Sequence, residues 1–290
     1  MESQENPPLL RAMVNSVQLA YKDQGSGIPI LCIHGSWDDH HSWDGVAAIL
    51  RQEFRVISYD RRGHSASTAP PGQGHLCDDV SDALALINEL GLSSAHIVGH
   101  SYGANVAVAL AGQFPADTQS LFVHEPPLFS LLNADSELEQ LRSFAAERMQ
   151  RAADLIKSGQ IENAARLFIE EVAFGEGSWE TLFSHSDRRT ILANADTWLD
   201  QFQDPQRLAV DVTRLQAYPH RITLSGGSAS LPCYRAVNRL ISHLLPKAFT
   251  VTIEGGAHGA HLSHPQAVAD AIRSHVNSAP GTAQQYTEVH

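Results

Sequence analysis

The sequence contains few cysteines, little positive charge and no long apolar run, and each shortage excludes a class of protein. Only three cysteines occur among its 290 residues, Cys32, Cys77 and Cys233, and they are far apart with no CxxC pair. An odd number of scattered cysteines argues against a disulfide framework and favours free thiols in a reducing compartment. We therefore expect a cytoplasmic protein without disulfides.

Basic side chains are outnumbered by acidic ones. Lys and Arg total 20 against 32 Asp and Glu, which gives a net charge of −12. Nucleic acids and anionic membrane surfaces are bound through positive surfaces, so we expect neither as a partner. No apolar run approaches the roughly 20 residues of a membrane span. The opening MESQENPPLL also lacks the basic and apolar regions of a signal peptide.

What the sequence does contain is an alternation of strand and helix patterns. Short apolar runs that end in polar or glycine residues are typical of parallel strands covered on both faces; they occupy 29–35, 54–60, 94–100, 120–125, 221–227 and 249–256. Helical patterns lie between them, at 43–53, 76–90, 102–114, 233–245 and 265–276. Segment 16–30 alternates and then turns, which indicates one antiparallel strand leading in. Together these patterns predict an α/β fold with a doubly wound, mostly parallel sheet.

The alternation stops between residues 128 and 215, where only helical patterns occur. We interpret 128–215 as a helical cap inserted into an α/β core that comprises 1–127 and 216–278. The terminal tail, 279–290, is expected to be disordered.

The octapeptide VGHSYGAN, residues 98–105, stands where a predicted strand meets a predicted helix. It matches G-x-S-x-G, with Gly99 and Gly103 on either side of Ser101. Small residues are needed because a turn this tight brings the backbone close to itself, and the turn exposes the serine hydroxyl above the sheet. In this context the motif predicts that Ser101 is a nucleophile; an ordinary glycine-rich turn is the alternative.

A serine nucleophile needs a base, and position must select it from the 16 histidines. The loop EGGAHGAHLSHP follows the last predicted strand and offers His258, His261 and His264. His258 comes first in the loop and is best placed to reach Ser101, whereas His261 and His264 are expected to be packing or pocket residues. The spacing of the three histidines matches no common zinc pattern.

Four motifs in the correct order resemble those of the α/β-hydrolase superfamily, and the resemblance covers nearly all of the chain. CIHGSWDDHHSW, SYDRRGHSAS, GHSYG and GAHGAHLSHP are similar to the family's His-Gly loop, the turn after the next strand, the nucleophile elbow and the histidine loop. The resemblance implies that the first histidine of the last motif, His258, is catalytic. It also implies an oxyanion hole formed by the backbone N–H groups of Ser36 and Tyr102.

The acid of such a triad is missing from its commonest place, just after the strand that reads ITLSGG here. No Asp or Glu occurs between Asp211 and Glu254. Glu125 instead ends the predicted strand in SLFVHEPPLF, at the sheet edge to which the histidine loop returns. Haloalkane dehalogenases and zearalenone-type lactonases are similar in carrying a glutamate at this strand end.

We predict that Glu125 orients the imidazole of His258; a solvated strand-end glutamate is the alternative. The two prolines that follow Glu125 restrict the residue before them to extended geometry. We therefore expect an extended backbone at Glu125, which would hold its carboxylate stiffly.

A second polar run, SWDDHHSWDG at 36–45, could suggest a metal site, but it does not match HxHxDH. A loop with a capped helix start explains it better, so we expect no metal and no cofactor. For the substrate pocket we predict residues close to the motifs and aromatic residues of the cap, namely Trp37, His100, Phe129, Trp179, Trp198 and His261.

A serine nucleophile predicts an acyl-enzyme, and therefore a small-molecule carboxylic ester or lactone as the substrate. The same scaffold resembles carbon–carbon bond hydrolases and cofactor-free dioxygenases, and acyl transfer or perhydrolysis differs only in the acceptor. From another class, some proteins of this fold are small-molecule receptors with little turnover. The fold does not decide among these alternatives.

Overall fold

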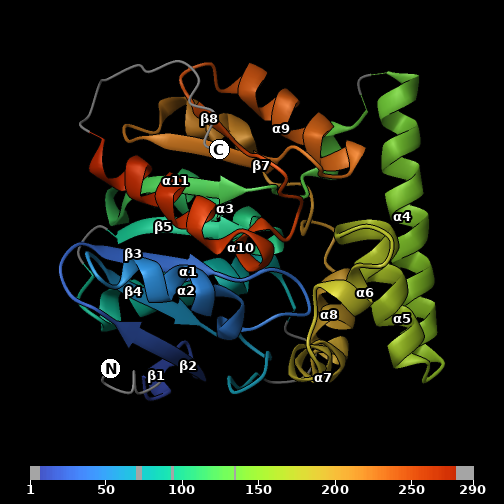
Figure 1. The fold of residues 1–290 in the computed structure, drawn as a ribbon, viewed down its shortest axis with the longest axis horizontal. Coiled ribbons are helices and arrows are strands. Elements are labelled where there is room, and N and C mark those ends of the chain that lie inside the picture. The colour runs from blue at the N-terminus through green and yellow to red at the C-terminus, as the bar shows by residue number, and fades with distance from the viewer. Residues whose placement is uncertain (1–6, 70–73, 93–94, 134, 279–290) are drawn as a thin grey trace.

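A computed structural model describes residues 7–69, 74–92, 95–133 and 135–278. It contains an eight-stranded sheet in the order β1-β2-β4-β3-β5-β6-β7-β8 (Figure 1). The pairs β1·β2 and β2·β4 are antiparallel and the other five pairs are parallel. The strands are β1 Leu10–Val14, β2 Val17–Gln24, β3 Pro29–Ile33, β4 Arg55–Tyr59, β5 Ala95–His100, β6 Thr118–His124, β7 Ile222–Gly227 and β8 Phe249–Ile253.

Helices cover both faces of this sheet. They are α1 Asp44–Leu50, α2 Leu76–Glu89, α3 Tyr102–Gln113, α9 Pro232–Leu244, α10 Ala260–Ser263 and α11 Pro265–Asn277. On one face, α1 and α11 pack over apolar side chains such as Ile30 and Val98. On the other face, α2, α3 and α9 share a second apolar cluster with Leu31 and Ile97. Every residue of β5 is buried, as a continuous apolar run predicts for a strand covered on both faces. The predicted α/β class and doubly wound sheet are confirmed.

Between β6 and β7 the described residues form helices joined by loops, without a strand. It forms α4 Ser136–Lys157, α5 Ile161–Leu167, α6 Ser178–Thr181, α7 His185–Ala193 and α8 Ala195–Phe202, with a π-helical segment at Phe168–Ala173 after α5. We call α4 to α8 the cap helices. Figure 1 shows them gathered beside one end of the sheet. The exact division between core and cap stays a prediction, and the expected disordered tail, 279–290, lies outside the described residues.

The amino-terminal part of the sheet differs from the prediction, because two antiparallel strands stand where one was expected. Strands β1 and β2 form a hairpin whose turn residues, Asn15 and Ser16, have φ values of 46° and 65°. Two positive φ values at the turn are typical of the tight hairpins that match the natural twist of strands. The Asn-Ser pair is a weaker hairpin signal than Asn-Gly, and β1 exposes three of its five residues. The strand reads LRAMV and is mostly apolar, so its sequence shows no regular alternation of apolar and polar residues.

Cys32, Cys77 and Cys233 are all unpaired, as the sequence predicts. Among the described residues, no helix combines the length and the apolar character that crossing a membrane requires.

Candidate active site

Ser101 occupies a sharp turn between β5 and α3. Its φ of 53° and ψ of −126° are unusual for a residue with a side chain. The flanking glycines show why the turn needs small residues. A Cβ on Gly103 would lie 2.3 Å from the carbonyl oxygen of Ile33, and one on Gly99 would lie 2.6 Å from that of Gly103. The strand, turn and helix therefore have the arrangement that the G-x-S-x-G pattern predicts.

His258 lies in the loop between β8 and α10, and its imidazole contacts Glu125. Nδ1 of His258 is 3.0 Å from Oε2 of Glu125, and both side chains are 1% exposed. The ring of Tyr234 stacks on His258 with centroids 4.0 Å apart, and Phe174 meets it edge-on at 5.2 Å. Among the described residues, Nε2 of His258 has no hydrogen-bond partner. These contacts fix the ring and leave Nε2 available for a proton.

Glu125 follows the last residue of β6, and its backbone differs from the prediction. Its φ is 50°, so the expected extended geometry before Pro126 is wrong. Surrounding hydrogen bonds impose this conformation. The backbone N–H of Glu125 donates to Ser225 O at 3.1 Å. Its Oε1 accepts from the N–H of Gly227 at 2.9 Å and from the hydroxyl of Ser230. A strained residue persists where its surroundings over-determine it, and here the strain aims the carboxylate at His258.

The environment of Glu125 favours the ionised carboxylate. Burial alone would raise its pKa, but the hydrogen bond from His258, the Coulombic effect of His124 and His258, and the hydrogen bond from Ser230 together outweigh burial and lower the pKa to about 2. A buried carboxylate with several donors stays charged near neutral pH. Glu125 can therefore accept the Nδ1 proton of His258 in a hydrogen bond and stabilise a positive charge on the ring.

The loop after β3 places Ser36 beside Ser101. Arg61 holds the backbone of this loop. Its guanidinium is fully buried and donates to His34 O at 3.2 Å and to Gly35 O at 2.9 Å. Asp79 pairs with the same guanidinium at 3.0 Å. We call residues 34–38 the Ser36 loop. The turn that contains Arg61 therefore supports the Ser36 loop.

A residue between two cap helices, Asn194, also holds the Ser36 loop. Its amide Nδ2 donates to Asp38 O at 3.1 Å and to Trp37 O at 3.4 Å, and its Oδ1 accepts from the N–H of Ser65 at 2.8 Å. Asn194 is 1% exposed. The cap helices therefore contact the loop that carries Ser36 directly, through a buried hydrogen-bonded residue.

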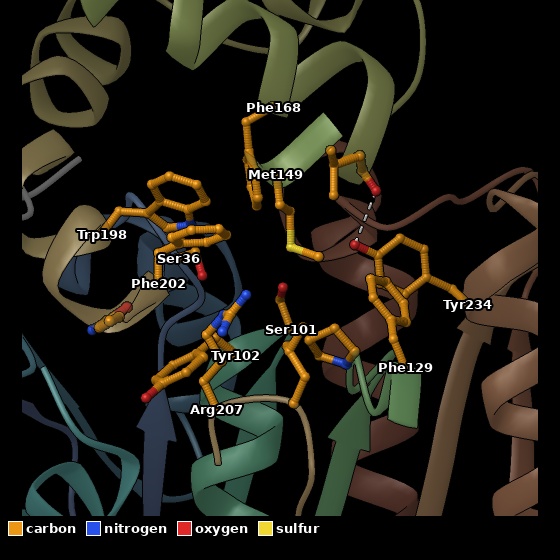
Figure 2. Close-up of a pocket in the computed structure, with 14 residues that line it drawn as sticks. Ser36, Ser101, Tyr102, Phe129, Met149, Phe168, Trp198, Phe202, Arg207 and Tyr234 are labelled. Carbon is orange, nitrogen blue, oxygen red and sulfur yellow. Dashed lines mark hydrogen bonds between the residues drawn. The ribbon is translucent and has the colours of Figure 1, made fainter. Parts of the chain in front are cut away.

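A cavity opens in front of Ser101 and is lined by residues of the core and the cap (Figure 2). Most of its lining side chains are apolar, and Ser36 and Tyr102 lie next to Ser101. The complete lining is Ser36, Ser101, Tyr102, Pro127, Phe129, Met149, Phe168, Val172, Trp198, Gln201, Phe202, Arg207, Leu208 and Tyr234. The predicted pocket residues Phe129 and Trp198 are among them.

The other four predicted pocket residues do not line this cavity. Trp37 stacks behind Trp198, with ring centroids 4.9 Å apart. Trp179 is buried in the cap, where the guanidinium of Arg188 lies over its ring. The rings of His100 and His261 contact each other with centroids 4.0 Å apart and their planes tilted by 40°.

His100 nevertheless supports the site from outside the cavity. Its Nε2 lies 2.9 Å from His258 O, and because a carbonyl can only accept, Nε2 must donate. The residue before the nucleophile therefore anchors the backbone of the histidine loop.

The polar run at 36–45 behaves as a capped loop. Asp39 accepts from the N–H of His41 at 2.8 Å and caps the short helix that begins at His40, while His40 pairs with Asp60 at 2.6 Å. Among the described residues, two groups of side chains have donor atoms within 4.8 Å of one another and could hold a metal ion. One comprises Asp39, His40 and His41 of this run, and the other Asp38, His100 and His261. The absence of a metal stays a prediction.

The family model described as "Alpha/beta hydrolase family" matches residues 30–271, which is most of the chain and includes all of the motifs above. The chain belongs to the alpha/beta hydrolase family. An uncharacterized hydrolase of Bacillus subtilis, YraK, is 32% identical over 241 residues, which are 80% of this chain and 83% of YraK. The structure of a thermophilic esterase from Thermogutta terrifontis has a TM-score of 0.73 at 23% identity, and the match covers 92% of this chain and 97% of the esterase.

Another relative matches only in part. An uncharacterized protein of Mycobacterium tuberculosis is 38% identical over 110 residues, which are 38% of this chain and 32% of that protein. The chain thus spans about a third of the length of this relative. The likeness to haloalkane dehalogenases and zearalenone-type lactonases stays a prediction.

Four residues of the site were not predicted from the sequence. Ser230 and Gly227 hold Glu125, Asn194 holds the Ser36 loop, and Arg207 lines the cavity. The stretch GGSAS at the end of β7 could have indicated donors for a carboxylate, because β7 is the strand next to β6. No local pattern marks Asn194 or Arg207.

Proposed function

We propose that this alpha/beta hydrolase cleaves a carboxylic ester or lactone through an acyl-enzyme, with Ser101 as nucleophile, His258 as general base and Glu125 as the orienting acid. The contact of 3.0 Å between His258 Nδ1 and Glu125 Oε2 carries the proposal. A buried carboxylate on one nitrogen fixes the tautomer in which the other nitrogen can take a proton.

The proposed reaction uses two half-reactions. Ser101 Oγ attacks the carbonyl carbon as its proton passes to Nε2 of His258, and the resulting imidazolium returns that proton to the leaving alkoxide. Water then gives a proton to Nε2 of His258 as its oxygen attacks the acyl-enzyme, and the imidazolium returns that proton to Ser101 Oγ as the bond to the acyl group breaks and the acid leaves. The negative oxygen of each tetrahedral intermediate would accept hydrogen bonds from the N–H groups of Ser36 and Tyr102. These steps use only groups of this chain, so the proposal needs no cofactor.

The cavity in front of Ser101 supports a small organic substrate. Figure 2 shows the Ser101 hydroxyl pointing into a space bordered by Met149, Trp198 and Tyr234. An apolar lining with a few polar groups is typical of small-molecule sites. Met149 and Trp198 belong to cap helices, so the cap contributes to substrate selection in this proposal.

Hydrolysis of p-nitrophenyl butyrate by the wild type and by the variants Ser101→Ala and His258→Ala tests the proposal. We expect each substitution to lower kcat by about 10³-fold or more, because either loss removes nucleophilic catalysis. The matched control is His264→Ala, which removes a histidine of the same loop whose Nδ1 bonds Ser263, and it should stay close to wild type. Wild-type inactivity on a range of esters and lactones, or full activity of folded Ser101→Ala, would contradict the proposal.

A further inference from the structure

One cationic side chain lies in the largely apolar cavity in front of Ser101. Among its lining residues, Arg207 is the only one that carries a charge at neutral pH. Figure 2 shows the guanidinium of Arg207 directed into the same space as the Ser101 hydroxyl, on the side where Ser36 and Tyr102 lie. A permanent positive charge in an apolar cavity is costly unless an anion compensates it.

The described residues supply no ion pair for that charge, although the nearby carboxylate of Asp204 partly offsets the effect of burial on the pKa of Arg207. Among the described residues, no carboxylate lies within ion-pair distance of the Arg207 guanidinium. The nearest acid in sequence, Asp204, uses its two carboxylate oxygens to accept from the N–H of Leu76 at 2.7 Å and of Gln206 at 2.8 Å. Arg207 has a hydrogen bond to the backbone of Asp204 and none to its carboxylate: Nη1 of Arg207 donates to Asp204 O at 3.0 Å.

The position of Arg207 is nevertheless fixed. Its guanidinium lies over the ring of Phe202 with 4.4 Å to the centroid, and its carbonyl oxygen accepts from Nδ2 of buried Asn105 at 2.8 Å. Burial lowers the pKa of Arg207, but an arginine stays protonated at any physiological pH. One of its five N–H groups donates to Asp204 O, and the planar fork can pair with a carboxylate through two of the others.

We infer that Arg207 binds a carboxylate of the substrate, so that the enzyme prefers esters or lactones that carry a second, ionised carboxyl group. The inference rests on the proposed ester or lactone hydrolysis and adds the charge of the substrate to it. The anionic group would lie at the Arg207 side of the cavity while the scissile carbonyl lies at Ser101. Arg207 is then a specificity-determining residue rather than a member of the catalytic set.

Two esters that differ in one charged group test the inference. p-Nitrophenyl hemiglutarate carries a carboxylate at the end of its acyl chain, and p-nitrophenyl valerate has a neutral chain of the same length. For Arg207→Gln we expect kcat/KM to fall by about 30-fold or more on the hemiglutarate, mainly through KM, and by less than about threefold on the valerate. A carboxylate on the leaving group is probed in the same way with phenyl acetate and 4-acetoxybenzoate.

Two further variants separate a specific contact from a general effect of charge. Arg207→Lys keeps the charge without the planar fork and should restore part of the preference. Arg214→Gln removes the same charge from an exposed side chain outside the cavity and should leave the ratio of the two rates unchanged. Activity on the valerate, with the near-ultraviolet circular dichroism of the wild type, establishes that Arg207→Gln is folded.

The outcomes for the two proposals are distinct. Loss of activity in Ser101→Ala on both esters of a pair supports the hydrolase, whatever the charge preference. Equal losses on charged and neutral esters in Arg207→Gln, or no loss on either charged ester, would overturn the role of Arg207 and leave the hydrolase standing. If the wild type cleaves none of these esters, the hydrolase proposal itself fails.

Discussion

The Nδ1 atom of His258 lies 3.0 Å from a carboxylate oxygen of Glu125, although 133 residues separate the two in the chain. The parallel sheet makes this contact possible, because β6 and β8 both end at the edge to which the histidine loop returns. Tyr234 and Phe174 enclose the imidazole, and Ser230 and Gly227 hold the carboxylate. The pair is therefore rigid before any substrate binds.

Replacing the acid tests its orienting role. We expect Glu125→Gln to lower kcat by about 10³- to 10⁴-fold with little change in KM, because an amide cannot stabilise the imidazolium and can favour the wrong tautomer. Steady-state kinetics on p-nitrophenyl butyrate measure this. The control is Glu254→Gln, an exposed glutamate just after β8, which should behave as wild type. A folded Glu125→Gln variant with more than a tenth of wild-type activity would show that another group orients His258.

The lowered pKa of Glu125 also predicts how stability depends on pH. Its pKa is about 2 in the folded protein against an ordinary value of 4.5. The stabilisation is therefore complete above pH 4.5 and is lost as the pH falls toward 2. Between these values the unfolded chain binds a proton that the folded protein does not. The free energy of unfolding should then fall by up to about 1.4 kcal/mol per pH unit from this group alone.

The measurement is the urea unfolding of wild type and Glu125→Gln at several pH values from 5.5 down to 3.5. Other buried acids, such as Asp79 with a pKa that burial raises to about 6, contribute equally to both proteins and cancel in the difference. The curve of the wild type should be steeper than that of the variant. Parallel curves would mean that Glu125 titrates alike in the folded and unfolded states.

Ser230 donates one of the hydrogen bonds that keep Glu125 ionised. Removing this donor in Ser230→Ala should raise the pKa of Glu125 and lower the free energy of unfolding by about 1–3 kcal/mol. The free energy of unfolding of Ser230→Ala should then fall less steeply than that of the wild type as the pH drops from 4.5 toward 2, because the pKa values of Glu125 in the folded and unfolded states lie closer together. Ser228→Ala is the control, because its hydroxyl bonds exposed Glu254 instead. A slope equal to that of the wild type would indicate that Gly227 and His258 suffice to hold the charge.

Asn194 links the cap to the Ser36 loop, and its truncation should affect turnover more than binding. Asn194→Ala leaves the carbonyls of Trp37 and Asp38 without this donor, so the N–H of Ser36 should be less well placed for the oxyanion. We expect kcat to fall by about tenfold while KM changes little. The control is exposed Asn163→Ala on α5. A loss of stability with unchanged kcat would assign Asn194 to cap packing alone.

Much of the fold could be predicted from the sequence, because local patterns determine it. The buried parallel strands are short apolar runs. Ser101 stands in a motif that needs glycine at Gly99 and Gly103, because a Cβ at either position would clash with the backbone. Strand β1 was missed because its five residues, LRAMV, show no regular alternation of apolar and polar residues, although the structure exposes three of them. The backbone of Glu125 was predicted wrongly, because hydrogen bonds from other segments override the local effect of Pro126.

The remaining parts of the site could not be read from the sequence, because they are contacts between distant segments. Asn194 meets the Ser36 loop across more than 150 residues, and Arg207 enters the cavity from the chain after α8. Neither residue belongs to a pattern that local chemistry would select. The polar runs at 36–45 and 254–265 were each considered separately as possible metal sites. The structure instead brings together Asp38 from the first run, His261 from the second and His100 from neither.

Covalent labelling of Ser101 tests the proposed triad most directly. A p-nitrophenyl alkylphosphonate reacts with a serine that a neighbouring base activates and stays attached, so intact-mass and peptide mass spectrometry can locate and time the reaction. We predict one adduct per chain, on Ser101, formed about 10³-fold more slowly in His258→Ala and in Glu125→Ala. An adduct on another residue, or equal labelling rates in the wild type and both folded variants, would contradict the proposed triad.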